Sequence, residues 1–107
     1  MARHRHHVYV VLLDDVVMND RRFAAANPGW NPARPCVYVG MTGLTPALRF
    51  ARHKAGVRAN RHVREHGLRL LPELYAYANP MPYAAACEME VELAAGLRAE
   101  GYAVWQA

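Results

Sequence analysis

The sequence is poor in cysteine and lysine and has no long apolar run, and each shortage narrows the class of protein. No stretch approaches the roughly 20 apolar residues that a helix needs to cross a bilayer, and the N-terminal segment lacks the layout of a secretory signal. The two cysteines, Cys36 and Cys87, lie in apolar stretches and not at the spacing of metal ligands, which favours inert, buried thiols in a reducing compartment. We therefore expect a cytoplasmic protein that has no membrane partner.

The length and composition favour one folded unit. A domain of this size buries roughly 65% of the surface that its unfolded form exposes. Of the 107 residues, 53% are hydrophobic and 21% are charged, a balance that argues against a disordered or fibrous protein. We expect a single domain over residues 1–107, and no internal repeat is visible.

Positive charge is concentrated in one part of the chain. The formal net charge is +4 and the isoelectric point is near 9.4, which points to a polyanionic partner such as nucleic acid. Lys54 is the only lysine among the 13 basic residues. A bias of the genome toward arginine codons would explain this preference for arginine, but it would not explain why basic residues cluster between positions 49 and 69. Within this cluster we predict phosphate contacts from Arg52, Lys54, Arg58 and Arg61.

Residue types predict two strands at the start of the chain, separated by a long insertion. The β-branched and aromatic run from His6 to Leu13 predicts a strand, and Cys36–Val39 predicts another that Gly40 ends. The three prolines within residues 16–35 favour an inserted loop or lid with at most one short helical turn.

Helix signals dominate the rest of the chain. Thr45 and Pro46 are typical of a helix start, and good helix formers continue up to Gly56. The remaining elements are predicted as a short helix over 60–66 capped by Gly67, an edge strand over 68–77 bent at Pro72, the longest helix from Pro82 to Gly101, and a strand or packed tail over 102–105.

Glu90 is the one carboxylate of the longest helix that points toward the protein interior. Its helical neighbours within about 60° are uncharged, whereas Glu88 and Glu92 lie about 160° away on the solvated face. A buried carboxylate is costly unless a cation, a hydrogen bond or a proton compensates it. Two interpretations remain open: a structural ion pair with an arginine, or a metal ligand or catalytic carboxylate at the floor of a cleft.

Arg49 and His53 form a second candidate constellation. They are four residues apart and therefore share a face of the predicted helix. A guanidinium matches two phosphate oxygens, and an imidazole exchanges a proton near neutral pH. The pair suits a phosphodiester, although a solvated basic face would have the same pattern.

The run from Tyr38 to Gly56 fixes a set of spaced residues, namely Tyr38, Gly40, Thr42, Arg49 and His53. It resembles the second half of the GIY-YIG nuclease signature, in which a Tyr-Ile-Gly strand end precedes a threonine, a helical arginine and, one turn later, a histidine or tyrosine. The first half would be the segment His7–Tyr9, with Tyr9 as the matching tyrosine. The chain is thus similar, over nearly its whole length, to small single-domain bacterial members of the GIY-YIG superfamily.

The resemblance also assigns roles in the last helix and beyond it. The metal-binding glutamate of the family would be Glu90, holding one divalent ion, Mg²⁺ or Mn²⁺, together with several waters. Many members place an asparagine beyond this glutamate, and the candidate amide here is Gln106. The implied fold is α+β, with a central three-stranded antiparallel sheet flanked by helices.

The activity that the resemblance implies is metal-dependent hydrolysis of phosphodiester bonds in nucleic acid, most simply DNA. Arg49 would stabilise the pentacovalent phosphate. Tyr9, Tyr38 and His53 would surround the attacking water, and one of them, most simply a tyrosine, would take its proton. The alternatives are a catalytically inactive nucleic-acid-binding module of the same fold, and an interaction subunit whose arginine-rich helices meet an acidic protein. We expect either weak intrinsic specificity for the substrate or a protein partner that supplies it.

Overall fold

The core of the protein is a four-stranded mixed sheet. The computed structural model describes residues 3–107, and its strands lie in the order β3-β1-β2-β4. Strand β1 (His7–Leu13) pairs antiparallel with β2 (Cys36–Thr42) and with β3 (Gly67–Leu70), whereas β4 (Ala103–Gln106) pairs parallel with β2. The predicted α+β class is confirmed. The predicted three-stranded antiparallel sheet is wrong, because the C-terminal residues cover the outer edge of β2 as a fourth, parallel strand.

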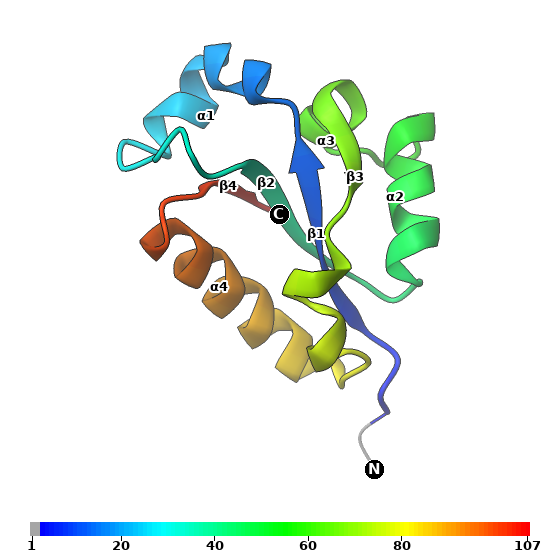
Figure 1. Ribbon diagram of the computed structural model, residues 1–107. Helices are drawn as coiled ribbons and strands as arrows, with labels where there is room; N and C mark the ends of the chain where they lie inside the picture. Colours follow the sequence, from blue (N-terminus) through cyan, green and yellow to red (C-terminus); the bar gives the residue numbers. More distant parts are fainter. Residues whose placement is uncertain (1–2) are drawn as a thin grey trace.

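Helices cover both faces of this sheet (Figure 1). Helices α2 (Pro46–Ala55) and α3 (Arg61–His66) lie on one side, and α4 (Tyr83–Ala99) lies on the other. The sheet register agrees with this arrangement, since Tyr9 lies opposite Gly40 and alternate residues point to opposite faces. Tyr9 bonds to α2, whereas Met41, one residue beyond Gly40, contacts Cys87 of α4.

Helices α2 and α3 begin and end close to the predicted residues because local capping determines them, and α4 begins directly after Pro82 without a side-chain cap. The Thr45 hydroxyl accepts a hydrogen bond from the Leu48 N–H, and Gly56 ends α2 with a φ of +83°, a left-handed conformation that favours glycine. The Asn60 side chain accepts from backbone N–H groups at the start of α3. Gly67 ends α3 in an extended conformation and is also the first residue of β3.

The insertion over residues 16–35 is more regular than its prolines suggest. It contains the 3₁₀ helix η1 (Asp15–Asn19) and the helix α1 (Arg21–Ala25), capped by Asp14 and Asp20 respectively. Val17 and Phe23 are fully buried, so this half of the insertion packs onto the domain. Residues 26–35 contain no helix or strand.

Two predicted strand limits are also corrected. Gly40 does not end β2, which continues to Thr42, and β3 ends at Leu70. Pro72 cannot donate to a sheet ladder, and it begins the first of two 3₁₀ helices, η2 (Pro72–Leu74) and η3 (Ala76–Ala78). Within residues 3–107, every helix is too short or too polar to cross a bilayer.

The two cysteines are free thiols. Cys36 is fully buried at the start of β2, and Cys87 is half-buried on α4. Burial raises the pKa of the Cys36 thiol to about 12, so at neutral pH it is an unreactive part of the core.

Candidate active site

Tyr9, Tyr38 and His53 form a buried cluster between the sheet and α2. The ring centroids of the two tyrosines lie 6.0 Å apart, and the Tyr38 and His53 centroids lie 5.5 Å apart. The three side chains are 1%, 4% and 0% exposed respectively. Tyr38 is therefore the most accessible of the three, and His53 has no contact with solvent.

Gly40 makes room for this cluster. A Cβ at this position would lie 2.7 Å from Tyr9 Oη and 2.9 Å from Tyr38 Cε1, which is closer than real Cβ contacts allow. The register of β1 and β2 places Gly40 directly opposite Tyr9, so the tyrosine ring crosses over the neighbouring strand. A glycine is thus required at position 40 because the rings of Tyr9 and Tyr38 leave no room for a side chain there.

Both ring nitrogens of His53 are engaged, which fixes its tautomer. The Asn60 backbone N–H donates to Nδ1 at 3.0 Å, so Nδ1 carries no proton. The single proton of the neutral ring is then on Nε2, which donates to Tyr9 Oη at 2.8 Å. Burial, together with the nearby positive charge of Arg49, lowers the pKa of His53 to about 4. His53 is a hydrogen-bond donor to Tyr9 and has no free position for a second proton.

Burial and the charge of Arg49 act in opposite directions on the two tyrosine hydroxyls. Burial raises the pKa of Tyr9 above its ordinary value, and the Arg49 charge acts in the opposite direction. Burial also raises the pKa of Tyr38, while the neighbouring Tyr9 hydroxyl and the charge of Arg49 oppose this rise. The hydrogen bond from His53 ends at Tyr9, and the positive charge of Arg49 favours the anionic form of both tyrosines against the effect of burial.

Arg49 lies beside this cluster at the wall of a small hollow. Its guanidinium donates to the backbone carbonyls of Val57 at 3.2 Å and Arg58 at 2.9 Å. The hollow has a volume of about 280 Å³, and its lining includes Arg49, Arg52, Arg58 and Thr42. Three arginines around one concavity suit a phosphate group.

Glu90 is buried, as predicted, but it lies on the opposite side of β2 from the tyrosines. It is 8% exposed on α4, and burial raises the pKa of its carboxyl. The Gln106 side chain donates to Glu90 Oε1 at 3.1 Å. Within residues 3–107 no cation lies within ion-pair distance of this carboxylate, so the interpretation as a structural ion pair with an arginine is wrong.

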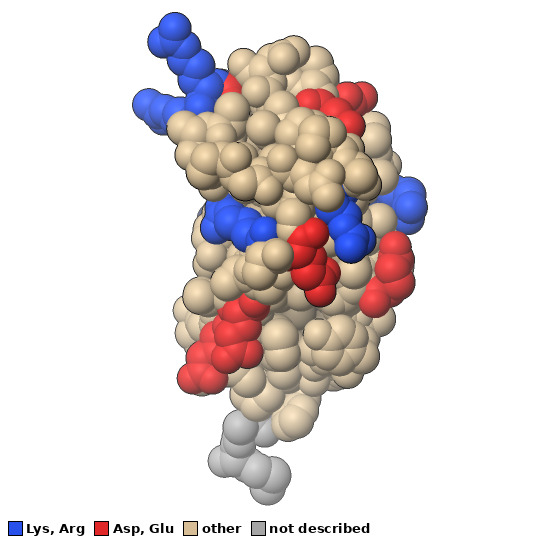
Figure 2. Space-filling model, turned by 60° about the vertical axis from the view of Figure 1, so that its left-hand side comes forward, with Lys and Arg blue, Asp and Glu red and all other residues tan. Residues whose placement is uncertain are grey.

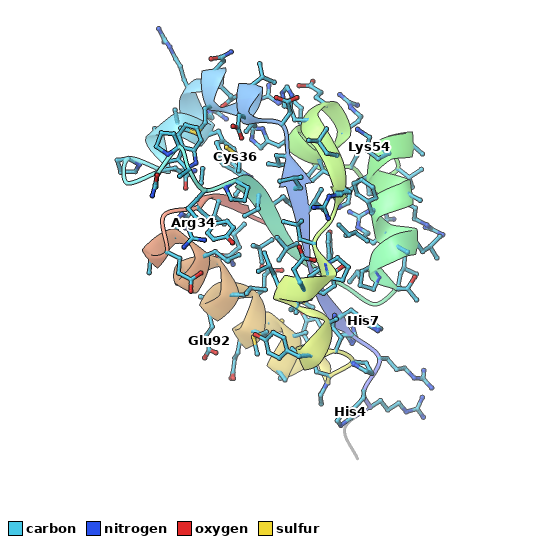
Figure 3. The ribbon with its side chains drawn as sticks, in the orientation of Figure 1. His4, His7, Arg34, Cys36, Lys54 and Glu92 are labelled. Atoms are coloured by element: carbon cyan, nitrogen blue, oxygen red, sulfur yellow. The ribbon has the colours of Figure 1, made fainter. Side chains whose placement is uncertain are left out.

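The other predictions for α4 hold. Glu88 and Glu92 are exposed, and Figure 3 shows Glu92 pointing away from the sheet. The negative charge of Glu90 contributes to the raised pKa of Tyr38, so the two groups interact electrostatically across β2. Strand β4 pairs with β2 only as far as Val39, and no described strand covers this edge of β2 beyond it.

Glu90 was also predicted to hold a divalent metal ion. No cluster of three or more histidine, cysteine, aspartate or glutamate side chains within residues 3–107 is arranged to hold one. One oxygen of Glu90 accepts from Gln106, and the other has no partner among the described hydrogen bonds. A single carboxylate oxygen fits a Mg²⁺ ion that keeps most of its waters, so the donor chemistry is compatible with the predicted metal.

The residues predicted to contact phosphate separate into two groups. Arg52 and Arg58 line the hollow beside Arg49. Lys54 is labelled in Figure 3 between α2 and α3, where its ammonium donates to the carbonyls of Arg64 and Gly67 at 2.9 and 3.0 Å. Arg61 forms an ion pair with Asp20. The structure thus gives Lys54 a role in holding the end of α3, while Arg61 belongs to a different part of the surface.

Asn60 is the residue of this site that the sequence did not indicate. Its side chain marks it as a helix cap, and that signal is visible in the sequence. Its backbone N–H orients His53, but every residue except proline has such a group, so the residue type does not predict this contact.

Comparisons with known proteins give no relative for this chain: no protein-family model matches it, and neither do any of the curated proteins or the solved structures.

Proposed function

We propose that the protein is a metal-dependent endonuclease that hydrolyses phosphodiester bonds in nucleic acid, most simply DNA, as its resemblance to GIY-YIG nucleases implies. The observation that carries the proposal is the buried cluster of His53, Tyr9 and Tyr38 beside Arg49, in which His53 donates a hydrogen bond to Tyr9. The cluster places two hydroxyl groups next to a guanidinium whose charge opposes the rise in their pKa, and hydrolysis of a phosphodiester requires both a proton acceptor and a cation.

The residues divide the work as follows. The guanidinium of Arg49 binds a phosphate in the hollow and offsets the charge that develops on it. Tyr38 takes the proton of the attacking water as its phenolate, after releasing its own proton to solvent, because it is the most exposed of the three buried rings and the charge of Arg49 opposes the rise in its pKa. His53 holds Tyr9 and does not itself accept a proton, since Nε2 already carries one.

Glu90 would hold the divalent ion, with Gln106 orienting the carboxylate. Mg²⁺ or Mn²⁺, when bound, supplies positive charge that offsets the charge on the leaving oxygen. Strand β4 covers the edge of β2 only as far as Val39, and a substrate at the edge beyond it would lie between Glu90 on one face and the tyrosines on the other.

The test is a cleavage assay on labelled nicked, branched and single-stranded DNA and on RNA, with and without Mg²⁺ or Mn²⁺. We expect metal-dependent cleavage that falls by about 10²–10⁴-fold in Tyr38→Phe, the range for loss of a general base. Tyr77→Phe is the matched control, because Tyr77 is 77% exposed. The proposal fails if no substrate is cut with either metal, or if Tyr38→Phe cuts at the rate of the control.

A nucleic-acid-binding module without turnover is the second candidate. The observation in its favour is that the Arg49 guanidinium already donates to two backbone carbonyls, while Glu90 lies across β2 from the tyrosines. This function predicts binding to the same substrates without any product, with or without metal. The cleavage assay therefore separates the two candidates.

A further inference from the structure

A second, larger hollow lies between α1 and α3, outside the candidate active site. Its volume is about 760 Å³, within the range of about 300–1,000 Å³ that is typical of small-molecule sites. The insertion contributes Arg21 and Arg22, α3 and its cap contribute Asn60 and Arg61, and β4 contributes Trp105. Figure 1 shows α1 and α3 at the same end of the sheet.

Trp105 is held rigidly in this lining by two aromatic neighbours. The Phe23 ring lies nearly parallel to it, at 16° and a centroid distance of 6.0 Å, and the His62 ring meets it at 4.7 Å and 66°. Phe23 is fully buried, so the indole is supported from the core. Trp105 is partly exposed in the lining of the hollow, and an indole in such a place can stack on a flat ring.

The charge of the hollow is positive. Asp20 is the carboxylate in the lining, and it is already engaged, because it accepts from the Phe23 N–H at 3.0 Å and pairs with Arg61. Arg21 and Arg22 are exposed and form no ion pair within residues 3–107. Guanidinium groups beside an aromatic platform match a phosphate attached to a base.

Asn60 connects this hollow to the candidate active site. Its side-chain oxygen accepts from the N–H groups of His62 and Val63, and its backbone N–H holds His53. The Asn60 side-chain NH₂ has no partner among the described hydrogen bonds and remains available to a base edge. The face that carries α4 is different, since Figure 2 shows acidic and basic side chains scattered over it without a patch of one sign.

We propose that this hollow binds one nucleotide of the substrate strand, with its base stacked on Trp105 and its phosphates held by Arg21 and Arg22. The proposal rests on the proposed function, in that the strand bound here is the one that continues to Arg49. An acidic protein segment would also suit the arginines, but it would leave the Trp105 platform unused. The inserted segment thereby becomes part of substrate recognition.

The experiment uses the fluorescence of Trp105 and includes a chelator, so that no cleavage occurs. Trp30→Phe leaves Trp105 as the single tryptophan, because the chain has 2. A short oligothymidylate should quench this fluorescence and bind about 5- to 150-fold more tightly than an abasic deoxyribose-phosphate strand of the same length, the range for loss of one stacked base. A polyglutamate peptide of the same charge should cause no quenching.

An arginine pair provides a second measurement that does not depend on replacing a packed ring. The double variant Arg21→Gln, Arg22→Gln should weaken oligothymidylate binding and lower the slope of log affinity against log salt by about 0.7 for each lost phosphate contact. Arg69→Gln, on the opposite edge strand β3, is the control for loss of an arginine away from the hollow and should bind like the parent.

The outcomes separate this proposal from the nuclease activity. Quenching that depends on Arg21 and Arg22, in a protein that cuts no substrate with metal, supports the nucleotide site and rejects the nuclease. Cleavage in a protein whose Trp105 fluorescence does not respond, or whose double variant binds like the Arg69 control, overturns the nucleotide site. Binding of polyglutamate as tight as that of oligothymidylate also overturns it, in favour of an acidic protein partner.

Discussion

Acid should destabilise the folded protein through His53. The imidazole is 0% exposed, and its Nδ1 accepts from the Asn60 N–H while its Nε2 donates to Tyr9. A second proton would have to go to Nδ1, which would break the bond from Asn60 and place a buried cation close to Arg49. The unfolded chain has no such restriction, so it binds the proton more readily than the folded protein does.

The size of this effect follows from the pKa of the ring. It falls from 6.5 to about 4 on folding. A lowered histidine pKa gives stability that is present above pH 6.5 and is lost as the pH falls toward 4, because protons then favour the unfolded state. Because each tenfold change in proton affinity corresponds to about 1.4 kcal/mol, the free energy of unfolding should fall by about 3 kcal/mol between pH 7 and pH 4. This is a large fraction of the roughly 5–15 kcal/mol that stabilises a typical domain.

The measurement is denaturant unfolding at pH 7 and pH 4 for the wild type and two variants. Carboxylates also titrate in this range, so the quantity of interest is the acid-induced loss in the wild type minus the loss in His53→Gln, which should be about 3 kcal/mol. His4→Gln is the control, since His4 is exposed and outside every helix and strand, and its acid-induced loss should equal that of the wild type. Equal losses in all three proteins would refute the argument that both nitrogens of His53 are engaged.

Three further perturbations test other contacts. Gly40→Ala should lower the free energy of unfolding by about 1–3 kcal/mol, the cost of overpacking, because its methyl group would lie 2.7 Å from Tyr9 Oη; an unchanged denaturation midpoint would contradict this. Glu90→Gln should leave the protein equally or more stable at pH 7. Burial raises the pKa of the Glu90 carboxyl, so the stability contributed by its protonated form at low pH is lost as the pH rises through that pKa. A lower denaturation midpoint for the variant at pH 7 would show that the charge is needed for folding. Arg58→Gln should lower the slope of log affinity against log salt for duplex DNA by about 0.9. Lys54→Gln should leave this slope unchanged but lower the melting temperature, because two backbone carbonyls lose their hydrogen-bond donor. Equal slopes for the two variants would contradict the assignment of Arg58 to phosphate binding and of Lys54 to folding.

The elements that were predictable from the sequence are those set by neighbours along the chain. Thr45 and Gly56 bound α2 through contacts within one turn, and the orientation of Glu90 follows from helical periodicity alone. The spacing of Arg49 and His53 places both on one face of α2 for the same reason. These features require no knowledge of what lies on the other side of the sheet.

The features that were missed depend on contacts between distant parts of the chain. The sequence of residues 102–105 is compatible with a strand or with a packed tail. Whether these residues pair with β2, as they do in parallel, depends on where the end of α4 lies relative to the sheet. The partner of Glu90 was likewise open, because helical periodicity gives the direction of a side chain but not its neighbour. The tautomer of His53 depends on a backbone N–H seven residues away, and every residue except proline offers such a group.

The fourth strand, which the sequence left open as a strand or a packed tail, determines how the candidate sites are built. Trp105 and Gln106 are adjacent in β4, and alternate residues of a strand point to opposite faces. Trp105 therefore meets Phe23 and His62 on the side of α1 and α3, while Gln106 reaches Glu90 on α4. A three-stranded sheet would leave the Glu90 carboxylate without its hydrogen-bond donor and the hollow between α1 and α3 without its aromatic wall. One short parallel strand thus positions the carboxylate proposed to hold the metal and, on the opposite face of the sheet, the ring proposed to stack on the substrate.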